Sequence, residues 1–264
     1  MSLPSLILRQ NLSTQATRAM SHACMLMDIA LRVVDITALE SFEAQLRQGA
    51  MPVGSVEFVR EAMRVAGMTE PGSMSYPESL HGHLEREVRQ IKASNIFELK
   101  GSHFLKPVRT KLFTGFVFDA QRSREEYDDH DREQLDAVMA LARHKTPHTL
   151  WISPNVSFYG EWRFYVQDGL VLASERYDDD ESDALAPDAL WVQEADRLSM
   201  ADTPIAAFAL EVGRLADGRC AVVEVNDGWS LGPGDYLQFL WARWQQMVSS
   251  LHLIPPGSPF VNHS

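Results

Sequence analysis

The chain has 264 residues, of which 45% are hydrophobic and 23% charged, so it is long enough to bury one large core or two smaller ones. A formal net charge of -12 argues against a broad electrostatic surface for nucleic acid or anionic membranes. With only two cysteines and no apolar run of membrane-spanning length, we expect a cytoplasmic protein with neither nucleic acid nor membrane as a partner.

The first part of the chain alternates segments with strand and helix patterns. The expected elements are a strand at 6–8, a helix capped by Ser13 and running towards Met27, a strand at 31–36, and a helix at 56–67 ended by Gly67. Such alternation favours a small α/β domain, which we assign to residues 1–95. Residues 68–80, rich in Gly, Pro and Ser, are the best linker candidate.

Strand patterns dominate the remainder, residues 96–264, which we assign to a second domain of α+β type. The expected elements are strands at 97–99, 104–106 and 113–118, and helices at 132–143 and 236–251. Asp168-Gly169 and Asp217-Gly218 each lie between apolar segments. Both pairs predict two-residue hairpin turns, because both turn positions need positive φ.

The hairpin around Asp217-Gly218 brings oxygen-bearing side chains together. Continuing the register from this turn places Glu211 opposite Glu224, while Asn226 and Val222 share a strand face with Glu224. Facing carboxylates repel unless a cation compensates, and oxygen ligands suit Mg²⁺. The spacing is equally compatible with glutamates that face solvent, and a bulge at Gly213 would shift the register.

The hairpin around Asp168-Gly169 predicts that Arg163 pairs with Ser174 and Glu161 with Arg176. Both guanidiniums then lie on one polar face, which is more often a solvated sheet surface with a cross-strand ion pair. Two guanidiniums so close together nevertheless make a candidate fork for phosphate or carboxylate.

A short basic turn follows the strand that ends at Lys106. Lys111, Thr114 and Gly115 come shortly after this lysine. Such a turn can fold over anionic phosphates, although a lysine at a strand end is usually only solvated. The turn does not match the phosphate-binding loop pattern GxxxxGK[ST].

In this order, FLKP with KLFTG, EWRFYVQDG, and LEVGRLADGRCAVVEVNDGWSLG resemble the ATP-grasp superfamily. The likeness is closest to the small bacterial and phage-associated ATP-grasp proteins of unassigned substrate, and it covers residues 96–248. The resemblance implies an α+β fold in which two α+β subdomains clasp ATP after a small α/β domain. Residues 96–264 would then be the ATP-grasp domain, with 1–95 preceding it.

The resemblance also implies a role for each candidate site residue. The ligands of Mg²⁺, or of Mn²⁺ in its place, would be Glu211, Glu224 and Asn226. The residues that bind the nucleotide would be Lys106, Lys111, Thr114, Gly115, Ser153, Asn155, Val156 and Glu161. The residues that act on the transferred phosphate or the substrate would be Lys111, Arg163 and Arg176.

The implied activity is that of an ATP-dependent carboxylate-amine ligase, which forms an amide or peptide bond through an acyl phosphate and releases ADP and phosphate. Its partners would be small-molecule or peptide carboxylates and amines. Phosphoryl transfer needs positioning and charge neutralisation rather than a protein nucleophile, which suits a site of carboxylates, lysines and arginines. A small-molecule kinase on the same fold and a nucleotide-binding regulatory module without turnover are the alternatives.

Overall fold

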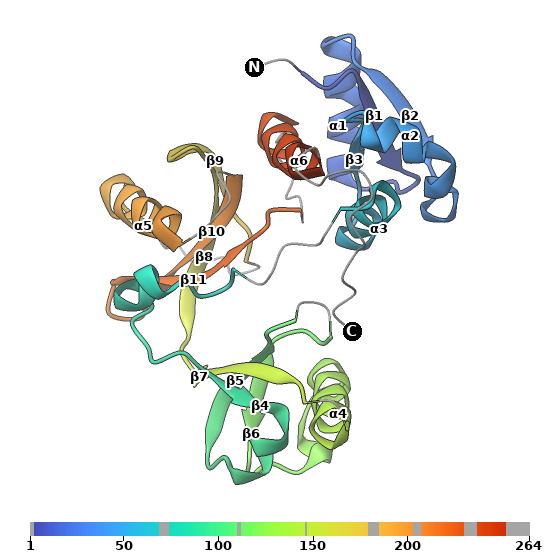
Figure 1. Cartoon of the computed structure of the whole chain (residues 1–264). Coiled ribbons are helices and arrows are strands. Elements are labelled where there is room, and N and C mark those ends of the chain that lie inside the picture. The colour runs from blue at the N-terminus through green and yellow to red at the C-terminus, as the bar shows by residue number, and fades with distance from the viewer. Residues whose placement is uncertain are drawn as a thin grey trace.

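The structure is a computed structural model that describes residues 3–68, 74–109, 112–145, 147–178, 185–202, 207–229 and 237–251. Three sheets organise this part of the chain, with strand orders β2-β1-β3, β4-β7-β5-β6 and β11-β10-β8-β9 (Figure 1). The architecture is α+β, as the sequence predicts. Within these ranges no helix is both long and apolar enough to cross a membrane.

The first sheet is parallel and forms a small α/β unit at the N-terminus. Its elements are β1 (Leu6–Gln10), α1 (Gln15–Leu26), β2 (Ala30–Val34), η1 (Ile36–Phe42), α2 (Glu43–Arg47), β3 (Met51–Val53) and α3 (Val56–Ala66). The predicted cap of the first helix is one residue off, because Thr14, not Ser13, accepts the hydrogen bond from the amide of Thr17. Gly67 ends α3 with φ of 76°, as predicted.

The second sheet forms a separate lobe with its own core. Its elements are β4 (Arg89–Lys92), η3 (Ala93–Glu98), β5 (Ser102–Pro107), β6 (Phe116–Asp119), α4 (Asp129–Arg143) and β7 (Thr149–Pro154). The predicted strand at 97–99 is wrong, because the short alternation there belongs to a 3-10 helix that buries Ile96 and leaves Phe97 58% exposed. β4 pairs with β7, so a strand that precedes the expected boundary after residue 95 lies in this sheet.

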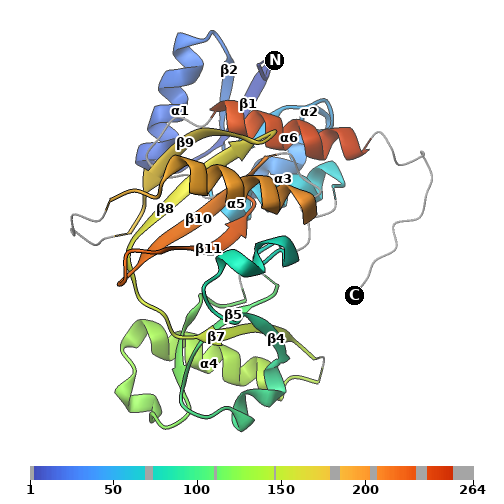
Figure 2. The same cartoon turned by 90° about the vertical axis from the view of Figure 1, so that its left-hand side faces the viewer.

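The third sheet is antiparallel and lies between the other two units. Its strands are β8 (Phe158–Gln167), β9 (Leu170–Arg176), β10 (Ala207–Leu215) and β11 (Cys220–Asn226). One face is covered by η2 (Glu78–His83) and by α5 (Ala189–Asp202), a helix that the sequence analysis missed (Figure 2). The core behind this face contains Val222 and Val225.

The other face of the third sheet packs against α6 (Leu237–Leu251), which also contacts the N-terminal unit. A single cluster of buried side chains joins Ile7 of β1 and Phe58 of α3 to Trp244 of α6, Tyr165 of β8 and Ala209 of β10. The helix therefore fixes the N-terminal unit to one end of this sheet face. The other end of the face is left for the lobe that contains β5 and β7.

Candidate functional site

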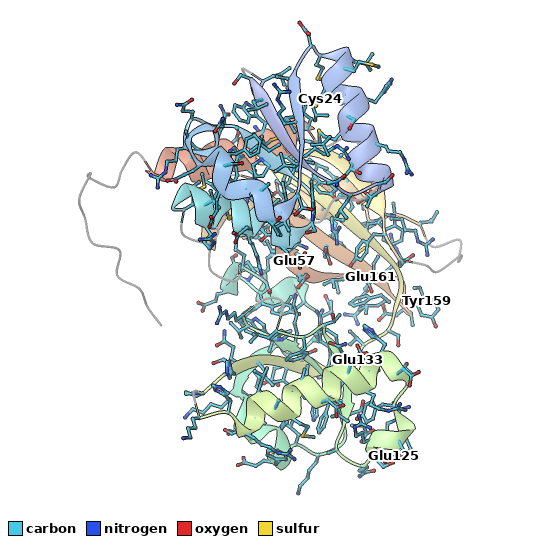
Figure 3. The ribbon with its side chains drawn as sticks, turned by 90° about the vertical axis from the view of Figure 1, so that its right-hand side faces the viewer. Cys24, Glu57, Glu125, Glu133, Tyr159 and Glu161 are labelled. Atoms are coloured by element: carbon cyan, nitrogen blue, oxygen red, sulfur yellow. The ribbon has the colours of Figure 1, made fainter. Side chains whose placement is uncertain are left out.

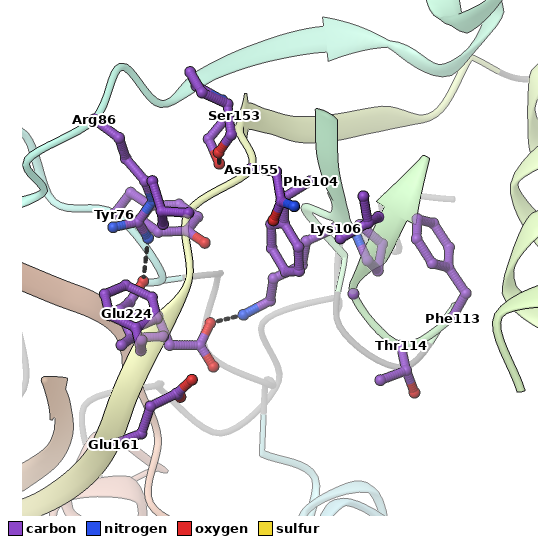
Figure 4. Close-up of a pocket in the computed structure, with 17 residues that line it drawn as sticks. Tyr76, Arg86, Phe104, Lys106, Phe113, Thr114, Ser153, Asn155, Glu161 and Glu224 are labelled. Atoms are coloured by element: carbon purple, nitrogen blue, oxygen red, sulfur yellow. Dashed lines mark hydrogen bonds and ion pairs between the residues drawn. The ribbon is translucent and has the colours of Figure 1, made fainter. Parts of the chain in front are cut away.

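A cavity of about 590 Å³ lies between the second and third sheets (Figure 4). The predicted site residues that line it are Lys106, Thr114, Gly115, Ser153, Asn155, Val156, Glu161 and Glu224. Figure 3 places Glu161 where the lobe of α4 meets the rest of the molecule. Lys111 lies outside the described residues. Residues from both expected parts of a two-sheet clasp therefore surround one space.

The side of the cavity that β5 supplies is apolar and closely packed. A Cβ atom added to Gly115 would lie 2.5 Å from Cζ of Phe104, so the turn and the ring approach as closely as a glycine allows. The amide of Thr114 donates to Oε1 of Gln134 at 2.7 Å, which fixes the same turn to α4. Phe104 was missed because an aromatic residue in a strand is usually core; here its neighbour Leu105 fills the core instead.

Lys106 and Glu224 meet across the cavity. Nζ of Lys106 forms an ion pair with Oε2 of Glu224, and each side chain is 18% exposed. Figure 4 shows the two side chains pointing at each other from opposite sheets. Burial lowers the pKa of Lys106 to about 8, while the carboxylates of Glu211 and Asp227 act in the opposite direction. This ion pair links the two sheets directly at the site.

Glu211 pairs with Glu224 across β10 and β11, as predicted, although the hairpin differs from the expected one. The turn is one residue longer, because the amide of Leu215 bonds to the carbonyl of Arg219, and Gly218 adopts φ of 83°. A register shift after Glu211 then leaves Val223 as a bulge. The two departures cancel at the glutamate pair.

The bulge decides which side chains of β11 face the cavity. Val223 and Glu224 both line it, whereas Val222 packs in the core behind the sheet. The prediction that Val222 shares a face with Glu224 is therefore wrong, because the extra residue breaks the alternation between them. Asn226 stays on the face of Glu211, to which its side-chain amide donates.

Arg86, which the sequence analysis missed, holds this bulge in place. Its guanidinium donates from Nη1 to the carbonyl of Val222 at 2.8 Å and from Nη2 to the carbonyl of Val223 at 2.9 Å. Burial lowers the pKa of Arg86. The side chain also lines the cavity. No sequence signal marks this arginine, because its partners are backbone carbonyls 136 and 137 residues away.

Glu211 is 4% exposed and sits in a dense hydrogen-bond network. Arg163 donates to its Oε1 from Nε at 2.9 Å and from Nη2 at 2.7 Å. Asn226 donates to the same oxygen at 2.6 Å, and the Tyr177 hydroxyl donates to Oε2 at 2.8 Å. Tyr177 also bonds to Glu161, whose pKa is raised by burial. Tyr177 was missed because it follows the last residue of its strand.

The predicted register of the β8–β9 hairpin is wrong beyond Tyr165. A shift between Tyr165 and Val166 pairs Arg163 with Glu175, and it pairs Arg176 with Trp162. The guanidinium of Arg176 lies 5.4 Å from the centre of the Trp162 ring, on the face opposite Arg163. The structure therefore brings Arg163 to Glu211 but does not bring Arg163 and Arg176 together.

The sequence and the fold can be compared with those of known proteins. A family model described as an ATP-grasp domain, family 3 of its clade, matches residues 36–247. The chain belongs to this ATP-grasp family. No curated protein sequence matches it. The cavity between the second and third sheets is thus the space between the two halves of an ATP-grasp fold.

Solved structures share the ATP-grasp fold with this chain at low sequence identity. D-cycloserine synthetase is 14% identical with a TM-score of 0.52, and the match covers 93% of this chain and 99% of that one. For D-alanine--D-alanine ligase from Bacillus anthracis complexed with ATP, the values are 12%, 0.52, 96% and 98%. For N5-carboxyaminoimidazole synthetase from Staphylococcus aureus, they are 10%, 0.54, 94% and 78%.

The residues of this ATP-grasp site fit a hard divalent cation in their chemistry. Within the described ranges, no three His, Cys, Asp or Glu side chains cluster as a metal site would require. Glu211, Glu224 and Asn226 nevertheless offer oxygens from paired positions on adjacent strands. Mg²⁺ usually takes one or two carboxylates and completes its shell with phosphate oxygens and water. Such a set suits a cation that arrives together with a nucleotide.

Proposed function

We propose that this ATP-grasp protein is an ATP-dependent ligase that joins a carboxylate to an amine and releases ADP and phosphate. The observation that carries the proposal is the meeting of Lys106 and Glu224 across a cavity of about 590 Å³, beside the Arg163–Glu211 pair. A cavity of this volume suits a nucleotide-sized ligand. Family membership and the fold shared with ATP-grasp ligases support the same activity.

The reaction is assigned to these residues as follows. The substrate carboxylate attacks the γ-phosphorus of ATP, the bond to ADP breaks, and an acyl phosphate forms. The amine then attacks the acyl carbon, phosphate leaves, and the amine loses a proton to solvent. Lys106 binds phosphate oxygens, and Arg163 steadies the transferred group. Arg176 has no part in this proposal because it lies on the other sheet face.

The remaining predicted residues supply binding. Ser153, Asn155 and Val156 contact the base from β7 and the segment after it, and Glu161 contacts the ribose. Thr114 and Gly115, with Lys111, cover the phosphates. Glu211, Glu224 and Asn226 would hold Mg²⁺ or Mn²⁺, whose charge offsets that of the phosphates when it is bound. The substrates are small molecules or peptides.

The two ion pairs have a consequence for how ligands enter. Each joins a side chain assigned to phosphate with a carboxylate assigned to the metal: Lys106 with Glu224, and Arg163 with Glu211. Each cation therefore competes with a metal ion for its carboxylate, and each carboxylate competes with phosphate for its cation. Metal and nucleotide relieve both competitions only when they bind together, so strong positive coupling is expected.

The function is tested by incubating the protein with Mg-ATP and pooled amino acids, peptides and cell extract while ADP is measured. A ligase gives a condensed product by mass, and hydroxylamine intercepts the acyl phosphate as a hydroxamate. Arg163→Lys keeps the charge but loses the planar fork, so turnover should fall more than ATP affinity. A stable phosphorylated hydroxyl product would establish a kinase, and ATP binding without ADP release would establish a binding module.

A further inference from the structure

A second cavity, of about 480 Å³, lies at the other end of the third sheet, between the β8–β9 turn and α5. Gly169 of the turn and Leu190, Glu194 and Asp196 of α5 are among its lining residues. None of them belongs to the candidate ATP-grasp site. The cavity therefore requires its own explanation.

The carboxyl group of Asp196 is the unusual feature of this cavity. Asp196 is 1% exposed, and its Oδ1 is buried with no hydrogen-bond partner in the part of the chain that the structure describes. An ionised carboxylate in such surroundings is costly unless a cation or donor reaches it. Burial raises the pKa of Asp196 to about 6, so a nearby positive charge would be needed to keep it fully ionised. Arg197 also lines the cavity, yet no described donor bonds to this oxygen, which leaves it available to a ligand.

The strand beside this cavity is open to pairing. β9 ends the order β11-β10-β8-β9, and no strand of the described part of the chain pairs with its outer edge. Leu170 and Leu172 of this strand are 65% and 41% exposed, and Leu190 at the start of α5 is 75% exposed. An exposed apolar edge strand presents free backbone donors and acceptors to another chain. An extended peptide could therefore add to this sheet.

From these features together we infer that the edge of β9 and the adjacent cavity form a docking site for an extended peptide with a basic side chain. The peptide backbone pairs with β9, and its apolar residues cover Leu170 and Leu172. A Lys or Arg side chain of the peptide enters the cavity and meets Asp196. Backbone pairing provides general affinity, and the charged contact provides selectivity. This site is independent of the proposed ligase activity, because it shares none of that activity's residues.

The test uses the full chain without ATP or metal. Fluorescence anisotropy measures binding of a labelled seven-residue peptide of alternating Val and Lys and of its Val and Glu counterpart. We expect the basic peptide to bind preferentially, and Asp196→Asn to weaken it at least tenfold, as loss of a charge-assisted hydrogen bond implies. Glu194→Gln, on the same helix and cavity wall, is the matched control for one lost charge and should leave affinity within about twofold.

A second variant tests the edge strand while leaving Asp196 intact. Leu172→Lys places a like charge beside the basic peptide and should also weaken it. Equal affinity of the wild type, Asp196→Asn and Leu172→Lys for the basic peptide would overturn the docking site, as would the absence of any peptide binding. Since nothing in this assay depends on ADP release, a failure here is distinguishable from a failure of the ligase proposal.

Discussion

Replacing Lys106 with methionine should change metal and nucleotide affinity in opposite directions. The ammonium group of Lys106 forms an ion pair with Glu224 in the free protein, and it is proposed to move to the phosphates when ATP binds. Methionine keeps a similar length without the charge. The variant should therefore free Glu224 for a divalent cation while removing a phosphate contact from the nucleotide.

The magnitude follows from the partial burial of the pair. A fully exposed pair would contribute about 0–1 kcal/mol, but both side chains here are only 18% exposed. A hydrogen bond to a charged group contributes about 1.5–3 kcal/mol. Converted to affinity, this range is roughly tenfold to a hundredfold. Lys106→Met should thus tighten Mn²⁺ binding to the nucleotide-free protein and weaken ATP binding by factors of this order.

Electron paramagnetic resonance of free Mn²⁺ measures the first change, and calorimetry with ATP measures the second. Lys106→Arg retains the positive charge, so its Mn²⁺ affinity should remain close to that of the wild type. Lys92→Met is the matched control, because it removes the same charge from an exposed position in the same sheet. Unchanged Mn²⁺ affinity in Lys106→Met would refute the competition between Lys106 and the metal at Glu224.

Three further predictions concern single residues. Glu224→Gln should abolish Mg-dependent ADP release while the circular dichroism spectrum stays that of the wild type, because the change removes a cavity-lining charge and no core volume. Gly115→Ala should lower ATP affinity with a smaller effect on melting temperature, since its Cβ would lie 2.5 Å from Cζ of Phe104 and displace the ring; equal ATP affinity would contradict this. Burial raises the pKa of Asp196 from 3.8 to about 6, so the folded protein retains a proton that the unfolded chain loses, and stability falls as pH rises through this window. Asp196→Asn should therefore raise the free energy of unfolding measured in urea at pH 8 but not at pH 4.

Much of the fold could be predicted from local patterns. The helix at 56–66 carries a serine cap, an apolar stripe and a terminal glycine, and each of these signals acts within a few residues. The helix at 189–202 was missed, although it covers a face of the third sheet, because its residues show no comparably clear pattern. The 3-10 helix at 93–98 was mistaken for part of a strand because three alternating residues do not distinguish the two.

The candidate site was predictable where it depends on motifs and unpredictable where it depends on tertiary contacts. Lys106 and Glu224 stand in segments with a family resemblance, and they line one cavity. Arg86 and Tyr177 could not be found, because what matters is the group they reach: carbonyls of β11 for the arginine, and two carboxylates for the tyrosine. A sequence pattern records residue types and not these partners.

Backbone irregularity, more than residue type, decided which predictions about the sheet held. In the β10–β11 hairpin a longer turn and a bulge cancel, so Glu211 still pairs with Glu224. In the β8–β9 hairpin a shift after Tyr165 has no counterpart closer to the turn, so every predicted pair beyond it is displaced by one residue. A displacement by one residue reverses the face of a strand side chain. Arg176 therefore faces Trp162 in place of the ATP-grasp site, and Tyr177 takes the position beside Glu161 and Glu211.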